Sequence, residues 1–140
     1  MEIRVTDNPR KQHKELQEAV TKISKLINSE NVSKKIEQIH NLLSELDGSL
    51  HFHLINEDES LYPALLRHPD KKIMKLTKQF QKEMGGLRHE FDNYIKKWLN
   101  AVSIQNNSDE FIKETTMTFN ALAYRIDKED NELYSLLDRL

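Results

Sequence analysis

Cysteine is absent from this 140-residue chain, and glycine and proline occur only three times each. Without cysteine there is no disulfide, thiolate nucleophile, iron–sulfur cluster or cysteine-based zinc site. Any metal site must therefore use histidine and carboxylate ligands. The scarcity of glycine and proline, together with 31% charged residues, favours long helices over strands and turns. We therefore expect an all-α protein.

Long apolar runs and a basic face are also missing. No apolar run approaches the roughly 18 to 20 residues needed to cross a bilayer, and the opening residues, MEIRVTDNPRKQHK, lack the apolar core of a signal peptide. The net charge is −2 and the lysines occur as scattered pairs, which argues against nucleic acid as a partner. We expect a cytoplasmic protein without membrane or nucleic-acid partners, whose oligomeric state the sequence leaves open.

Four segments of the chain have apolar residues at intervals of three and four, which predicts four amphipathic helices. The length fits one domain, and we expect residues 1–140 to form it. Short polar joints between the helices predict an antiparallel up-down-up-down four-helix bundle. The predicted helices start at Asp7, run from about Ile36 to Pro69, run from Lys71 to Val102 with a weak point at Gly85 and Gly86, and start after a cap at Ser108.

One stretch of the sequence occurs nearly unchanged a second time. HLINEDESLYP begins at His53, and RIDKEDNELYS begins 72 positions later at Arg125. The alignment pairs Glu57 with Glu129 and sets a histidine in the first copy against an arginine in the second. The repeat predicts that the second and fourth helices are duplicated halves, with both glutamates at similar depths in the bundle.

Four of the polar residues, His13, His53, Glu57 and Glu129, lie on the apolar faces of the predicted helices. An unpaired carboxylate on such a face costs several kcal/mol, so it must be neutralised, paired or bound to a metal. His53 and Glu57 are four residues apart and project from one face of the helix, one turn apart. Inward His and Glu ligands of this kind suit iron, manganese or zinc.

These residues resemble the hemerythrin-like, or HHE cation-binding, domains. That family has a histidine early in helix 1, His-x-x-x-Glu followed by Leu-Tyr-Pro in helix 2, a histidine in helix 3, and His-x-x-x-Glu or Asp in helix 4. His13 matches the first element, HLINEDESLYP the second and Glu129 the last carboxylate. The resemblance covers nearly the whole chain and implies non-heme iron. In the family these positions hold a carboxylate-bridged di-iron centre, used for oxygen carriage, sensing, iron-linked regulation or repair of iron centres.

Two positions depart from the family pattern. Arg125 stands where helix 4 should offer a histidine, and a guanidinium has no lone pair for a cation. In helix 3, at about 100° per residue, His89 lies about 180° from Phe80 whereas Glu83 lies about 60° from it. We therefore expect Glu83 to face the interior as a ligand and keep His89 as the alternative.

Two classes of function follow from this set of residues. In the first, the chain is a metal-binding module that handles or senses iron, oxygen or nitric oxide, with a degenerate site for at most one metal. In the second, Arg125 pairs with buried carboxylates, and a metal-free bundle binds a protein partner. No catalytic spacing or phosphate loop indicates an enzyme, and we expect no catalytic residue; an oxidase or peroxidase that uses the iron centre stays open as a third class. We expect Tyr62 and Tyr134 to pack at the bundle end with their hydroxyls near solvent.

Overall fold

The computed structural model describes residues 6–28, 30 and 32–139, so residues 1–5 and 140 of the predicted domain lie outside it. The described residues contain helices and no strand, which confirms the all-α prediction. None of the helices in these ranges combines the length and apolar character required to span a bilayer. The described helices are α1 (Asp7–Leu26), α2 (Ile36–Asn56), η1 (Glu57–Leu61), α3 (Tyr62–Leu66), α4 (Lys71–Met84), α5 (Leu87–Trp98), α6 (Ala101–Asn106), α7 (Ser108–Lys128), η2 (Glu129–Tyr134) and α8 (Ser135–Asp138).

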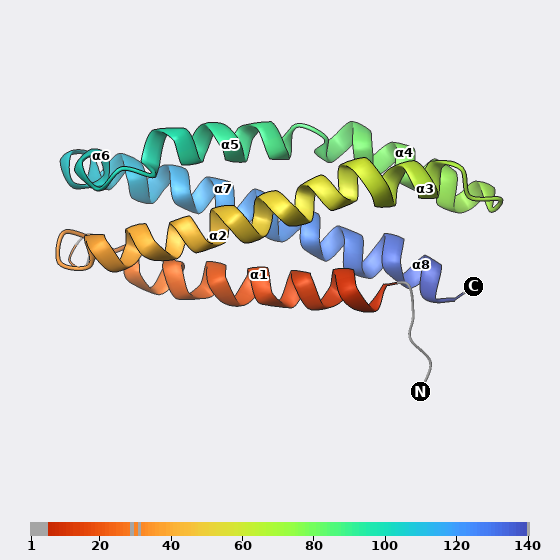
Figure 1. Cartoon of the computed structure of the whole chain (residues 1–140), viewed down its shortest axis with the longest axis horizontal. Helices are drawn as coiled ribbons and strands as arrows, with labels where there is room; N and C mark the ends of the chain where they lie inside the picture. Colours follow the sequence, from red (N-terminus) through yellow and green to blue (C-terminus); the bar gives the residue numbers. More distant parts are fainter. Residues whose placement is uncertain (1–5, 29, 31, 140) are drawn as a thin grey trace.

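These helices assemble into a bundle. Within the described residues there are four long rods: α1; α2 with η1 and α3; α4 with α5; and α7 with η2 and α8. The chain reverses direction from one rod to the next, and the short α6 lies at the turn between α5 and α7 (Figure 1). α1 packs on α2, α2 on α5, α5 on α7 and α7 on α1, so the rods enclose one interior. The predicted four-helix bundle is confirmed.

The structure confirms the predicted starts of the helices, with one exception. α1 begins at Asp7, and α4 begins after Asp70, whose side chain accepts a hydrogen bond from the backbone N–H of Lys72 at 2.8 Å. The predicted cap at Ser108 is wrong. Ser108 is already the first helical residue of α7, and its hydroxyl donates to the carbonyl of Ile104.

The third predicted helix is divided. Gly85 and Gly86 form a turn between α4 and α5, and α5 ends at Trp98. Asn100 then starts α6 by accepting a hydrogen bond from the backbone N–H of Val102 at 2.9 Å. Two successive glycines carry no side chain that restricts the backbone, which favours the break. Buried residues continue on both sides of the glycine pair, with Phe80 before it and Leu87 after it, so the two helices form one rod.

Two segments of the bundle have π-helical hydrogen bonding. η1 and η2 begin at Glu57 and Glu129, the paired positions of the two sequence copies. The N–H of Tyr62 bonds to the carbonyl of Glu57, so this turn holds one residue more than an α-helical turn. The extra residue shifts the side chains that follow, and Tyr62 is buried whereas Leu61 is only partly so.

Two apolar clusters fill the interior. The larger reaches Leu54 in α2 and Ile126 in α7, and the smaller contains Tyr62 and Leu133, which follow the start of the π-helical segments. Between the two clusters, the second and fourth rods carry the inward polar residues at positions 53, 57, 125 and 129. The bundle thus places a polar layer between two apolar ones.

Candidate metal centre

Four side chains converge in this polar layer. His13 from α1, His53 from α2, Glu57 from η1 and Glu129 from η2 each offer one ligand atom, and these atoms lie within 4.8 Å of one another. Each residue is at most 3% exposed. No other group of three or more such residues in the described part of the chain has this geometry.

The Nδ1 atom of each histidine, His13 and His53, donates a hydrogen bond to an acceptor outside the cluster. His13 Nδ1 lies 2.7 Å from Asp130 Oδ1, and His53 Nδ1 lies 2.6 Å from Gln12 Oε1. A carboxylate and an amide oxygen can only accept, so each Nδ1 carries the hydrogen and donates it. The Nε2 atom of each ring is thereby directed to the centre of the layer, which is the arrangement found in metal-binding histidines.

The two glutamates complete the cluster. Glu57 Oε1 contacts His53 Nε2 and lies 3.9 Å from His13 Nε2, while Glu129 Oε1 lies 3.5 Å from the same atom. Among the described residues, neither Nε2 atom and neither of these oxygens has a hydrogen-bond partner of good geometry, although all are buried. Buried polar atoms without partners are costly and rare. One bound cation would satisfy all four, so the residues fit a metal ion.

Arg125 lies beside the cluster and is 2% exposed. Its Nη2 lies 3.4 Å from Glu57 Oε2, and its Nε lies 3.4 Å from Glu129 Oε1. Asp58 Oδ1 lies 3.7 Å from the same Nη2. Each glutamate therefore has one oxygen near a histidine and also contacts the guanidinium, which brings a permanent positive charge into the layer.

The charges of the layer are strongly coupled. Burial lowers the pKa of His13, but the hydrogen bond to Asp130 and the nearby carboxylates of Glu129 and Glu57 outweigh this and raise the pKa to about 11. Burial, followed by the charge of Glu57, raises the pKa of Glu129 to about 8. Burial alone would also raise the pKa of Glu57, yet its close contacts with Glu129 and both histidines hold the pKa well below its usual value. Without a metal, the layer therefore keeps His13 protonated.

The predicted positions of the two tyrosine hydroxyls, near solvent at the bundle end, are wrong. Tyr62 is 2% exposed, donates a hydrogen bond to Glu129 Oε2 and accepts one from Arg125 Nη2 at 3.4 Å. Tyr134 is fully buried and stacks on the ring of His13, with 5.4 Å between ring centroids. The extra residue in each π-helical turn brings these rings inward, next to the polar layer.

The third rod contributes neither of its predicted ligands. Glu83 is exposed and accepts a hydrogen bond from Gln79 Nε2 at 3.1 Å, so its predicted inward orientation is wrong. Glu83 shares α4 with Phe80 and lies about 60° from it, at the edge of the apolar face, where a charged side chain reaches solvent. The alternative, His89, is also exposed and lies 3.4 Å from Asn93 Nδ2.

Sequence reasoning missed the residues that orient the histidines. Asp130 and its counterpart Asp58 follow the two glutamates in both copies of the repeat, so their duplication was an available signal. Gln12 gave none, because it is adjacent to His13 and lies about 100° away around the helix. Tyr62 and Tyr134 also occupy paired positions of the repeat.

Comparison with known proteins agrees with this geometry. A family model described as Hemerythrin HHE cation binding domain matches residues 4–137, a range that includes all four converging residues. Comparison with curated proteins returned no match, and neither did comparison with solved structures. The family match spans nearly the whole sequence. The chain belongs to the hemerythrin HHE cation-binding domain family.

Proposed function

We propose that residues 1–140 form a single metal-binding domain that holds one divalent ion, iron in the first instance, through His13, His53, Glu57 and Glu129. The family and the buried His and Glu cluster indicate a metal-binding module. The convergence of four buried ligand atoms without hydrogen-bond partners is the observation that supports this ligand set. The outer hydrogen bonds to Asp130 and Gln12 would hold both rings in the metal-binding tautomer.

Charge balance supports one metal rather than two. Among the buried groups, Glu57 and Glu129 bring two negative charges and Arg125 brings one positive charge, so one divalent ion already makes these groups net positive. A second divalent ion would add two more positive charges. The third rod would supply no ligand for it, since Glu83 and His89 are both exposed. We propose that Arg125 takes the part that a second metal would otherwise play.

Bound iron would supply one-electron redox chemistry and affinity for oxygen and nitric oxide, so we propose that the domain handles or senses one of these species. The protein's own contribution is a buried layer from which bulk water is excluded. His13 would release the proton on Nε2 when the metal binds, while Nδ1 stays bonded to Asp130. No described contact identifies an organic substrate, so the proposal includes no catalysis.

Removal of one ligand tests this proposal. The protein is reconstituted with ferrous iron under anaerobic conditions and desalted, and its iron content is measured. His53→Ala should lose most of the bound iron, because it removes an Nε2 ligand from a rigid helix. His51→Ala is the matched control, since His51 lies on the same helix but is exposed, and His89→Ala tests the alternative ligand.

The two controls should keep the iron content of the unmodified chain. Equal iron content in His53→Ala and His51→Ala would refute the ligand assignment, and a loss in His89→Ala would restore the alternative ligand. The metal-free interaction module, in which Arg125 only pairs with carboxylates, predicts no bound iron in any of these proteins.

A further inference from the structure

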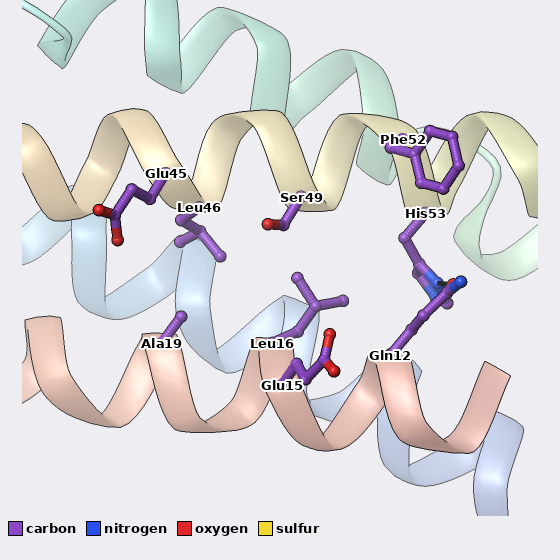
Figure 2. A pocket seen from close by; sticks show the side chains of 9 residues that line it. All are labelled: Gln12, Glu15, Leu16, Ala19, Glu45, Leu46, Ser49, Phe52 and His53. Carbon is purple, nitrogen blue, oxygen red and sulfur yellow. Dashed lines mark hydrogen bonds between the residues drawn. The ribbon is translucent and has the colours of Figure 1, made fainter. Parts of the chain in front are cut away.

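The proposed ligand atoms are buried, yet two of the residues that carry them line hollows on the surface. A groove of about 270 Å³ lies between α1 and α2 and is bordered by Gln12, Leu16, Ser49 and His53 (Figure 2). A second hollow of about 350 Å³ is bordered by Pro9, Gln12, His53 and Glu57. Both contain Gln12 and His53, so these two side chains lie where the hollows meet.

The interior on the other side of the cluster is closed. Arg125, Tyr62 and Tyr134 are each at most 2% exposed and pack against the glutamates and His13. On the side of α1 that faces η2, Arg10 covers the cluster. It forms ion pairs of 2.9 Å to Asp138 and 3.9 Å to Asp130. The hollows between the first and second rods therefore come closest to the ligand atoms.

Gln12 closes this side with a single side chain. It is half-buried, projects from α1 towards α2 and meets His53 (Figure 2), with a hydrogen bond of 2.6 Å to Nδ1. Its amide is uncharged, whereas the partner of His13 is a carboxylate, and hydrogen bonds to charged groups are the stronger kind. Rotation of Gln12 would break one hydrogen bond and join the two hollows at His53.

The groove between α1 and α2 also favours the approach of a cation. Glu15 and Glu45 line it, and no lysine or arginine does (Figure 2). A cleft lined by one sign of charge raises the local concentration of the opposite ion. The acidic lining leads to the same end of the groove at which Gln12 covers His53.

We propose that a divalent metal ion enters and leaves the centre through the groove between α1 and α2, and that Gln12 is the residue that closes this path. The inference rests on the proposed metal site. In the closed position Gln12 also positions His53 by accepting its Nδ1 hydrogen. Loss of a residue that closes the path should raise the association and dissociation rates of the metal together. Loss of a residue that only positions a ligand should raise the dissociation rate and weaken the affinity.

Rates of metal exchange separate these two roles. Co²⁺ serves as the probe, with association followed in a stopped-flow absorption experiment and dissociation followed after addition of excess chelator. In Gln12→Ala both rates should rise by about tenfold, the change expected when the barrier to opening loses one hydrogen bond. Gln17→Ala removes an exposed glutamine from the same helix and should leave both rates unchanged. Arg10→Ala opens the opposite side and should not speed association; because Arg10 also contacts Asp130, which holds His13, only the association rate of this variant is compared.

Three results would overturn the inference: unchanged rates in Gln12→Ala, faster dissociation without faster association in Gln12→Ala, or faster association in Arg10→Ala but not in Gln12→Ala. Gln12→Asn, whose amide is one methylene too short to reach His53, gives the same comparison if the alanine variant folds poorly. An unmodified chain that binds no Co²⁺ would count against the proposed function itself. Binding with rates that do not depend on Gln12 would count only against this path.

Discussion

Arg125 brings a fixed positive charge into the polar layer, beside the proposed metal ligands. Its guanidinium contacts one oxygen of Glu57 and one of Glu129, and it donates to the hydroxyl of Tyr62. Its nitrogen atoms have no lone pair for a metal. The same position in the first sequence copy is His53, which faces the cluster through Nε2. The two halves of the layer therefore differ at this position, which is a histidine in the first copy and an arginine in the second.

Two substitutions of Arg125 test its role. One should lower the stability of the protein and the other should raise its metal content. In the metal-free protein, Arg125→Ala removes one of the two buried cations that face Glu57 and Glu129, the other being protonated His13, and the free energy of unfolding should fall by about 3 to 5 kcal/mol. Arg125→His introduces a lone pair in place of a fixed charge and should raise the iron content above that of the unmodified chain. Urea denaturation and metal analysis measure the two effects.

The control for this pair is Arg67→Ala, because Arg67 is exposed at the end of α3. It should change neither the free energy of unfolding nor the iron content. An Arg125→Ala protein as stable as Arg67→Ala would mean that the guanidinium does not neutralise the layer.

At the scale of secondary-structure elements, the π-helical segments η1 and η2 place Tyr62 and Tyr134 beside the proposed metal ligands. Each starts at a site glutamate, and each holds one residue more per turn than an α-helix. Helices α3 and α8 continue beyond them with apolar residues facing the smaller cluster. We infer that each segment acts as a one-residue insertion in an otherwise regular helix.

Deletion of a single residue tests this interpretation. Loss of Ser60, which is exposed within η1, should convert the turn to α-helix and keep Tyr62 and Leu65 facing inward. Loss of Ser49, exposed in the regular part of α2, should rotate the remainder of that rod by about 100° and remove its apolar face from the core. Circular dichroism during thermal unfolding should show a cooperative transition for the first variant and none for the second. Similar loss of structure in both would contradict the inserted-residue interpretation.

The elements also show what could be predicted from the sequence. Regular α-helical spacing predicted the four rods and the inward positions of His13, His53, Glu57 and Glu129, because each lies on an uninterrupted stripe. Glu83 was misplaced because it lies about 60° from Phe80, at the edge of the apolar face, where helical spacing alone does not separate a buried from a solvated charge. Tyr62 and Tyr134 were misplaced because a π-helical turn depends on how buried side chains pack, and one sequence does not reveal that.

On the scale of the whole molecule, the bundle surrounds a charged layer with two apolar clusters. The protons bound in that layer therefore contribute to the stability of the complete fold. For Glu129, with a pKa raised from 4.5 to about 8, this contribution is full below pH 4.5 and is lost as the pH rises through 8. For His13, with a pKa raised from 6.5 to about 11, it is full below pH 6.5 and is lost as the pH rises through 11.

The metal-free protein should therefore become less stable as the pH rises from about 6.5 to 8.5, since the folded state binds these protons more tightly than the unfolded state. Stabilisation by one equivalent of Zn²⁺ should grow over the same range, because the metal replaces the proton on His13. Thermal midpoints with and without Zn²⁺ measure both trends. His51→Ala should keep both trends, whereas a metal-free midpoint that rises with pH would show that the layer does not hold these protons.

The central claim is that this fold holds one metal ion and that Arg125 replaces a second. The most direct measurement is an anaerobic calorimetric titration of the metal-free, unmodified chain with ferrous iron, with the bound iron determined by elemental analysis after desalting. The account predicts saturation at one iron per chain, with His13, His53, Glu57 and Glu129 as the ligands. Two tightly bound ions per chain, or none, would contradict it.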